Sequence, residues 1–272
     1  MSKTLQIFLF LCFAAIRLSA SDNYPVGARS IALSNAFISV TDLWSTFHNQ
    51  ATLSSLTSFS AGVFYESKYL VDELSLAAGT IVLPALEGTL GFSFYQLGEG
   101  TFKENKIGLA YSKRLSQKLN AAIQFDYFSY RFPENEKSRG FPTFEAGITY
   151  RATQELSLGF HVFNPIKNGV KTYFGKETLA AKYRLGGHYK FSDMVLLAFE
   201  IEKQTDIKIK AKSGLEFLPL KNLALRIGFS GKPAQISGGI GYSFSKITTN
   251  IAFSYHRSLG FSPSVSVNYQ LR

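Results

Sequence analysis

The stretch Leu223-Ala224-Leu225-Arg226-Ile227-Gly228-Phe229-Ser230 decides how this chain folds. Large apolar side chains occupy every second position, and small or charged side chains occupy the positions between them. A period of two places these two kinds of side chain on opposite faces of a β-strand. The stretch 264–271 repeats the pattern, with Val265 and Val267 set against Ser264 and Ser266. Both stretches therefore predict strands with one apolar face and one hydrophilic face.

The same alternation continues from Thr57 to the end of the chain, in about fourteen segments. They lie near residues 57–67, 73–83, 86–96, 104–113, 118–131, 142–151, 155–163, 178–190, 194–203, 206–217, 221–230, 235–243, 247–256 and 263–271. Strands that cross a bilayer at a tilt need about 9–11 residues, whereas strands of soluble proteins commonly have about five or six. The length of the segments therefore favours strands that cross a membrane.

The connections between the segments alternate in length. Connections such as Pro84-Ala85 and Ser192-Asp193 are short, whereas 133–141 and 164–177 are longer. Short periplasmic turns and longer outer loops are typical of bacterial outer-membrane barrels, and an even number of strands places both termini in the periplasm. We therefore expect an all-β fold: a transmembrane antiparallel β-barrel of about 14 strands in the lipid of the outer membrane. A soluble secreted β-protein with a structural role is the alternative, because its apolar faces would meet in a core.

The N-terminal residues differ from the rest of the chain. Lys3, the apolar run 5–16 and small residues near Ala20 are typical of a secretory signal peptide over residues 1–20. The only cysteine, Cys12, lies in that run, so residues 21–272 offer no thiol or disulfide chemistry. Residues 21–56 are rich in Ala, Ser and Asn and do not alternate. We expect them to form an N-terminal hatch or plug, followed by the barrel over residues 57–272.

Composition and motifs argue against several functions. The formal net charge is +10, but the basic residues are scattered, so nucleic acid is not an expected partner. No apolar run is long enough for a membrane-spanning helix. A Ser–His pair could hydrolyse lipid, which directs attention to His161, His188 and His256. However, the chain has no Gly-x-Ser-x-Gly motif and its four histidines have no metal-ligand spacing. We therefore expect no catalytic residue, no metal and no cofactor.

Charged residues on hydrophilic faces of three neighbouring segments predict an ion ladder in the lumen. Its members are Arg184, Glu200, Glu202, Lys208 and Lys210. Counting across the turns at Ser192-Asp193 and Thr205 aligns Arg184, Glu202 and Lys208 in one row, and places Glu200 beside Lys210 in the next. Opposite charges across neighbouring strands stabilise a sheet. The favoured interpretation is a structural ladder that needs no ligand, and the alternative is a constriction that selects for charge.

Short motifs resemble those of a known family. Gly27-Ala28-Arg29 begins the stretch 27–36, and Asn49-Gln50-Ala51 lies within the stretch 42–53, shortly before the first strand. The stretch His161–Ile166 ends a middle strand with an asparagine. These stretches resemble the PorV/PorQ family of outer-membrane proteins, which is related to the FadL-type long-chain fatty acid transporters. Gln50 stands where that family usually has proline.

The resemblance implies a fourteen-stranded barrel with the N-terminal segment folded inside as a hatch. Trp44, His48, Asn49 and Gln50 are then the candidates to plug the lumen, either by static packing or as a mobile gate. FadL-type members pass hydrophobic ligands, and PorV-type members serve type IX protein secretion in Bacteroidota. The expected function is thus a passage for small hydrophobic compounds or a membrane scaffold. The expected partner is a hydrophobic ligand or, as an alternative, a protein of the secretion system.

Overall fold

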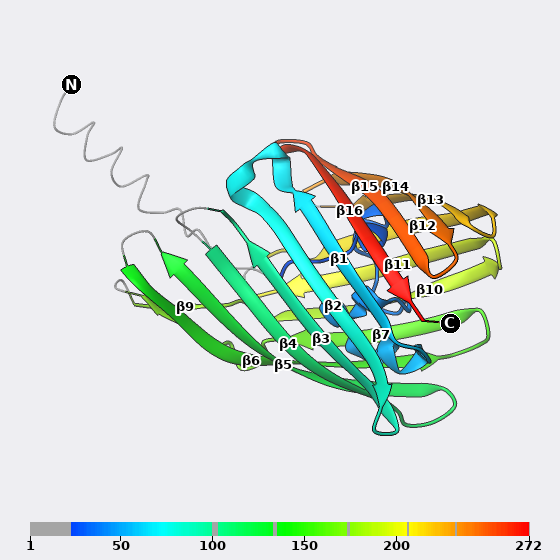
Figure 1. The fold of residues 1–272 in the computed structure, drawn as a ribbon, viewed down its shortest axis with the longest axis horizontal. Helices are drawn as coiled ribbons and strands as arrows, with labels where there is room; N and C mark the ends of the chain where they lie inside the picture. Colours follow the sequence, from blue (N-terminus) through cyan, green and yellow to red (C-terminus); the bar gives the residue numbers. More distant parts are fainter. Residues whose placement is uncertain are drawn as a thin grey trace.

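Fourteen antiparallel strands form one closed barrel in the computed structural model (Figure 1), which describes residues 23–99, 103–132, 135–172, 175–205, 207–231 and 233–271. The predicted signal peptide lies outside these residues. The barrel strands are β1 (Ser60–Ser67), β2 (Ser75–Ala85), β3 (Gly88–Leu97), β4 (Lys103–Arg114), β5 (Leu119–Phe132), β6 (Asn135–Arg151), β7 (Leu156–Phe163), β10 (Lys182–Ser192), β11 (Val195–Gln204), β12 (Lys210–Leu220), β13 (Leu223–Ser230), β14 (Gln235–Phe244), β15 (Ile247–His256) and β16 (Gly260–Gln270). Neighbours in sequence pair throughout, and β1 closes the barrel against β16.

The predicted strands and their two faces are confirmed. Each predicted segment overlaps one barrel strand, and the apolar rows point outward, as shown by Leu109, Phe125 and Ile227, which are 57%, 63% and 58% exposed. On the inner face of β16, Ser264 and Ser266 are buried. Because the apolar rows lie on the outside of a closed barrel, they do not meet in a core, as the alternative of a soluble β-protein required. Among the described residues, no helix is long and apolar enough to cross a membrane.

The two ends of the barrel differ in the length of their connections. At one end, which we call the short-turn end, the connections are as brief as Leu86-Glu87 between β2 and β3. At the other, which we call the loop end, β1 and β2 are joined through η3 (Lys68–Leu70) and η4 (Asp72–Leu74). Also at the loop end, β7 and β10 are joined through a separate hairpin, formed by β8 (Gly169–Thr172) and β9 (Gly175–Thr178).

The prediction of a long connection over 133–141 is wrong. Strand β6 begins at Asn135 and continues the pairing with β5, with Tyr130 opposite Arg139 and Phe128 opposite Phe141. The sequence over 135–140 carries no apolar alternation. The backbone pairing with β5 continues through residues without apolar alternation, which a hydrophobicity pattern cannot reveal.

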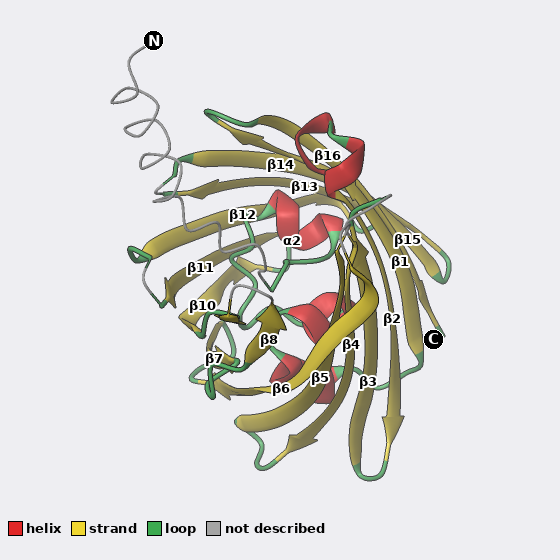
Figure 2. Ribbon diagram, turned by 90° about the vertical axis from the view of Figure 1, so that its left-hand side faces the viewer, coloured by secondary structure: helices red, strands yellow, loops and turns green. Residues whose placement is uncertain are grey.

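The described residues that precede β1 lie inside the barrel (Figure 2). This hatch, residues 23–56, contains α2 (Ala28–Ala32), η1 (Leu43–Phe47) and η2 (Gln50–Ser55). The side chains of Asp42 and Asn49 accept hydrogen bonds from the backbone N–H of Trp44 and Ala51, which begins each of the two 3-10 turns. A barrel of eight strands is filled by its own side chains, and wider barrels enclose a channel or a plug. The hatch therefore supplies the core that these strands cannot supply themselves.

The outward rows predict a depth-dependent cost for charge. Leu109 lies in the middle of β4, whereas Phe244 is the last residue of β14 and is 73% exposed. We expect Leu109→Arg to destabilise the barrel in a bilayer by about 2–4 kcal/mol, and Phe244→Arg by at most about 1 kcal/mol, because the bilayer centre excludes charge most strongly. Denaturant unfolding in lipid vesicles measures both values. Equal costs would contradict the assignment of this face to lipid.

Candidate functional site

The four residues predicted to plug the lumen are all buried in the hatch. The indole Nε1 of Trp44 donates a hydrogen bond to Oδ1 of Asn268 on β16, at 2.9 Å. The amide of Gln50 donates to Oε2 of Glu145 on β6, also at 2.9 Å. Nε2 of His48 lies 2.9 Å from the carbonyl oxygen of Val26 within the hatch. Side chains of the hatch therefore reach the barrel wall on two separate sides.

His48 is electrically neutral at neutral pH. Its burial, together with the positive charge of Arg184, lowers its pKa to about 3. The carbonyl oxygen of His48 accepts a hydrogen bond from Nη2 of Arg184 on β10. His48 therefore links the hatch to β10 through its backbone carbonyl, and its neutral ring adds no charge to the lumen.

Asn49 fits into a notch in the barrel wall between β6 and β7. Its amide donates to the carbonyl oxygens of Ile38 in the hatch and Ile148 on β6, at 2.8 and 3.1 Å. Two glycines make room for this contact. A Cβ atom at Gly147 would lie 2.0 Å from Oδ1 of Asn49, and one at Gly159 would lie 2.7 Å from the carbonyl oxygen of Ile38. Only glycine lets the hatch approach the wall this closely.

The notch is one part of a ring of inward glycines that contact the hatch. At each, an added Cβ would come within about 3 Å of a hatch atom; the members are Gly62, Gly91, Gly147, Gly159, Gly214, Gly228 and Gly239. Close packing of this kind is lost when a methyl group is inserted, at a typical cost of about 1–3 kcal/mol. The wall is therefore shaped to hold the hatch in one position.

A buried ion cluster that the sequence analysis missed lies in the middle of the lumen. The ammonium group of Lys106 on β4 contacts the carboxylates of Glu145 on β6 and Asp126 on β5, the latter at 3.4 Å. Glu145 also accepts from Nε2 of His161 at 2.9 Å, and Nη2 of Arg184 lies 2.9 Å from Nδ1 of the same ring. The cluster joins five neighbouring wall strands, β4, β5, β6, β7 and β10. The sequence signal that could have revealed this cluster is a titratable residue on the hydrophilic face of each of these strands.

The predicted ion ladder exists in an altered register. Glu200 and Glu202 are both bound by Lys212, at 2.9 and 2.7 Å. The strands pair Glu202 with Lys210 and Glu200 with Lys212, while Lys208 is exposed in the connection between β11 and β12. The predicted partners of Glu202 and Glu200, which were Lys208 and Lys210, therefore each lie two residues too early in the sequence. The connection between β11 and β12 spans 205–209, where a shorter turn was expected.

Arg184 of the predicted ladder lies opposite Glu202, as expected. Its guanidinium nevertheless turns to His161 and to the hatch. Glu200 likewise serves the hatch, because its Oε2 accepts from the backbone N–H groups of Phe37 and Ile38, each at 3.1 Å. The ladder therefore acts as a set of anchors for the hatch as well as a link between strands.

Arg29 fastens the start of the hatch to the wall. Its guanidinium donates to both carboxylate oxygens of Glu216 on β12, at 2.8 and 2.7 Å, and to Asp42 at 3.0 Å. Burial alone would lower the pKa of Arg29, but the charges of Glu216 and Asp42 raise it, so the residue stays cationic. A bidentate pair of this kind fixes orientation as well as position. Helix α2 is thereby held against the strands that follow β11.

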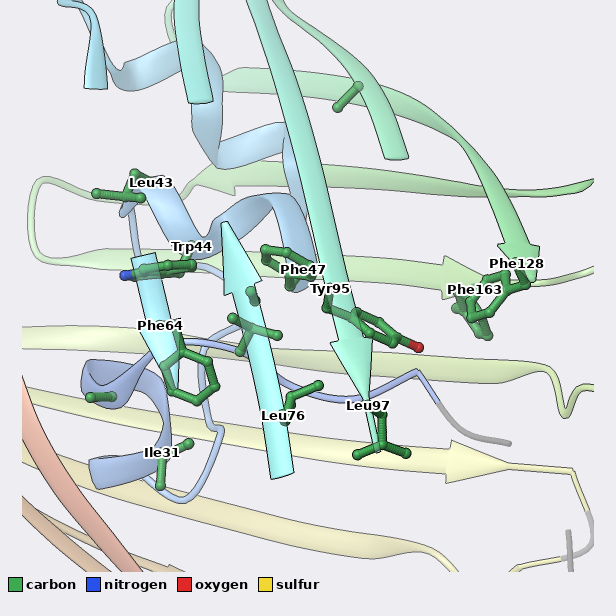
Figure 3. Packing of buried hydrophobic residues seen from close by; sticks show 14 of the residues in the cluster. Ile31, Leu43, Trp44, Phe47, Phe64, Leu76, Tyr95, Leu97, Phe128 and Phe163 are labelled. Carbon is green, nitrogen blue, oxygen red and sulfur yellow. The ribbon is translucent and has the colours of Figure 1, made fainter. Parts of the chain in front are cut away.

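On the loop side of the ion cluster the lumen holds many apolar rings, together with the buried carboxylate of Glu104, which accepts a hydrogen bond from the hydroxyl of Tyr95 at 2.6 Å. Tyr95 lies next to Phe47 of the hatch, and Phe128 and Phe163 lie together beyond Tyr95 (Figure 3). We call this set the aromatic cluster: Tyr95, Phe128, Tyr130, Phe141 and Phe163. The Lys106 ammonium lies 5.3 Å from the centroid of the Phe163 ring, a distance typical of cation–π contact. The interiors of water-filled porins are polar, so this part of the lumen suits an apolar occupant.

The remaining two histidines, His188 and His256, each contact a neighbouring side chain. His188 lies 2.8 Å from Oγ of Ser39, and His256 packs edge-on against Tyr69 at the loop end. Among the described residues, no group of three or more His, Cys, Asp or Glu side chains could hold a metal ion.

Comparisons with known proteins identify the fold. No protein-family model and no curated protein matches the sequence. Among solved structures, the P. putida toluene transporter TodX is similar with a TM-score of 0.69 and 13% identity, over 90% of this chain and 98% of that one. The fold is that of FadL-type barrels.

Two further structures support this assignment. The Ralstonia pickettii toluene transporter TbuX is similar with a TM-score of 0.66 and 11% identity, over 90% of this chain and 98% of that chain. A Pseudomonas aeruginosa FadL homologue gives a TM-score of 0.65 and 12% identity, over 92% and 99% of the two chains. At these identities the likeness concerns the fold alone.

The notch predicts that Gly147 tolerates no side chain. We expect Gly147→Ala to displace Asn49 and destabilise the protein by about 1–3 kcal/mol. Gly79→Ala is the matched control, because a Cβ there would meet nothing closer than 3.7 Å. Denaturant unfolding followed by the fluorescence of Trp44 in the hatch measures both variants. A Gly147→Ala protein as stable as Gly79→Ala would show that the hatch does not occupy the notch.

The central ion cluster predicts a large effect of removing one charge. Glu145→Gln leaves Lys106, which is fully buried, with only Asp126 as a carboxylate partner. We expect a loss of about 3–5 kcal/mol, typical of a broken buried pair. The matched control is Glu87→Gln, which breaks the exposed pair with Lys113 and costs at most about 1 kcal/mol. The free energies of unfolding compare the two, and similar values would contradict the buried cluster.

Proposed function

We propose that this protein is an outer-membrane passage for small hydrophobic compounds, closed by its hatch. The observation that carries the proposal is the aromatic cluster, which lies inside the barrel and beside the hatch. Stacked and edge-on rings, such as Phe128 against Phe141 at 5.5 Å and against Phe163 at 5.9 Å, form a surface that favours flat apolar molecules. A passage for ions or sugars would need a polar lining at this level.

The exterior supports the proposed location. Outward side chains such as Leu109, Phe125 and Ile227 form an apolar surface too large for a soluble monomer. We place the short-turn end in the periplasm, because short periplasmic turns and longer outer loops are the usual arrangement. The first barrel strand begins and the last one ends at that end, with Ser60 paired to Gln270.

Passage requires the hatch to move. On the short-turn side of the aromatic cluster, the lumen is closed by the wall residues Lys106 and Glu145 and by the hatch residue Gln50. The rings of Tyr95, Phe128 and Phe163 are themselves buried, so a ligand must displace part of their packing. Tyr24 of the hatch packs edge-on against Tyr95 at 5.9 Å, so a ligand that enters among these rings meets the hatch directly.

The comparisons support the class of cargo. TodX is described as a toluene transporter and a monoaromatic hydrocarbon channel, and TbuX as a toluene transporter. Flat aromatic compounds fit the ring-lined site of this chain. We therefore extend the proposed cargo to small aromatic hydrocarbons.

An accessory role in type IX protein secretion, as in PorV-type members, is the alternative. Two features of the loop end favour a partner protein there: the extension of β6 beyond the pattern of alternation, and the separate β8–β9 hairpin. Purification from native membranes distinguishes the roles. A secretion accessory brings a bound protein with it, whereas a passage protein is isolated alone.

The proposed gate predicts that locking the hatch stops transport. The hydroxyl oxygens of Thr46 in the hatch and Thr80 on β2 lie 2.9 Å apart. Because residues 21–272 contain no cysteine, Thr46→Cys with Thr80→Cys introduces a single possible disulfide. We expect the oxidised double variant to lose uptake of radiolabelled toluene in intact cells, and a reductant to restore it.

Each single cysteine variant is the control and should transport at the normal rate in both redox states. The disulfide itself is verified by the difference in gel mobility with and without reductant. Normal toluene uptake by the fully oxidised double variant would show that this hatch is a static filler and would reject the gate.

A further inference from the structure

Two cavities open at the short-turn end of the barrel, on either side of Thr41 in the hatch. The first has a volume of about 300 Å³ and lies between the hatch and β12–β16. The second has a volume of about 350 Å³ and lies beside β5, β6, β7 and β10. The first cavity is lined by four cationic side chains and two carboxylates, which leaves an excess of two positive charges. These residues are Arg29, Lys221, Arg226, Lys246, Asp42 and Glu216.

Hydrogen-bond donors in the first cavity are left without acceptors. Arg226 donates through Nε to Glu216 at 2.5 Å and through Nη1 to Oδ1 of Asn250 at 2.9 Å, while its Nη2 has no partner among the described residues. Asn250 is 1% exposed, and its Nδ2 is buried without a hydrogen-bond partner in the described part of the chain. An unsatisfied buried donor is costly. Both donors belong to side chains that line the cavity.

We propose that this cavity is a binding site for an oxyanion, a carboxylate or phosphate group, held by Arg226 and Asn250. Asp42 and Glu216 together balance the charges of Arg29 and Arg226, so the excess of positive charge comes from the two lysines, while Nη2 of Arg226 keeps a donor that is free among the described residues. Lys221 and Lys246 are exposed at the mouth of the cavity and attract an anion toward it. Charge-assisted hydrogen bonds from a guanidinium are the usual means of holding such groups.

The second cavity provides a contrast at the same end of the barrel. Its cations, Arg151 and Lys190, are exposed. Its asparagine, Asn120, already donates to Oγ1 of Thr149 at 3.1 Å. Positive potential is therefore common to both cavities, but donors that lack acceptors distinguish the first. The contrast between the two cavities therefore distinguishes a specific anion site from general attraction of anions by positive charge.

The oxyanion can have two sources. It is either a small free anion that enters from the short-turn end, or the charged head of an amphiphile whose apolar tail extends into the lumen. The two sources share the same contacts with Arg226 and Asn250. They differ in whether an alkyl chain strengthens binding.

The only tryptophan of the chain reports on the cavity. Trp44 donates to Asn268, which is a lining residue of the first cavity. We would titrate the purified full-length protein with inorganic phosphate and with hexyl phosphate, and follow the fluorescence of Trp44. The variants are Asn250→Asp, which adds a negative charge, and Asn250→Leu, which removes the donor at similar volume. The matched control is Asn120→Asp in the second cavity.

We expect saturable binding by the unaltered protein and by Asn120→Asp, and binding weaker by about tenfold or more in both Asn250 variants. Equal affinities for the two probes indicate a free anion, and tighter binding of hexyl phosphate indicates an amphiphile; either result supports the site. Gel mobility before and after heating establishes that each variant is folded. Two results would overturn the proposal: no saturable response in the unaltered protein, or equal weakening in the Asn120 and Asn250 variants.

Discussion

A barrel of fourteen strands encloses more space than its own side chains can fill, and the structure is organised around that constraint. The hatch fills the space, but its short helical turns and irregular segments leave many backbone N–H and C=O groups that need partners in a dry interior. The wall supplies them: Glu200 accepts from two consecutive hatch N–H groups, and Arg184 donates to the carbonyl of His48. The ring of inward glycines then brings the hatch backbone close enough for such contacts. The inward glycines and the inward charges therefore follow from one requirement: the hatch that fills this wide barrel needs partners for its backbone groups.

Burial of this many charges is stable only because they balance locally. In the central cluster, Lys106 and Arg184 face Asp126 and Glu145, and the neutral His161 connects the two halves. Desolvating an ion costs several kcal/mol, so an unpaired charge at this depth would unfold the site. The pairs come from different strands, which also fixes the register of β4 through β7 and β10. Charge in this lumen thus specifies the structure more than it adds stability.

The sequence predicted what depends on local periodicity and missed what depends on register. The alternation in Leu223–Ser230 places each residue on the correct face, because that property needs only the strand itself. The pairing of Glu200 with Lys212 depends on the length of the connection between β11 and β12. Because a shorter connection was expected, Lys210 was predicted to lie opposite Glu200, two residues too early in the sequence. Lys106, Asp126 and Glu145 are far apart in the sequence, and only the staggered pairing of β4, β5 and β6 brings them together. Trp44, Asn49 and Gln50 were identified because the family resemblance singled out their segment.

The attachments of the hatch differ between its two halves, and this difference bears on how it could open. The first half is tied to the wall by charge, through Arg29 to Glu216 and through the N–H groups of Phe37 and Ile38 to Glu200. The second half is tied through uncharged groups of the hatch: the side chains of Trp44, Asn49 and Gln50, and the carbonyl oxygen of His48, which accepts from Arg184. All members of the central ion cluster belong to wall strands, so it stays paired when Gln50 withdraws. Because a neutral amide exchanges its partners for water at lower cost than a buried ion does, the second half is the one that can leave its place while the first remains anchored.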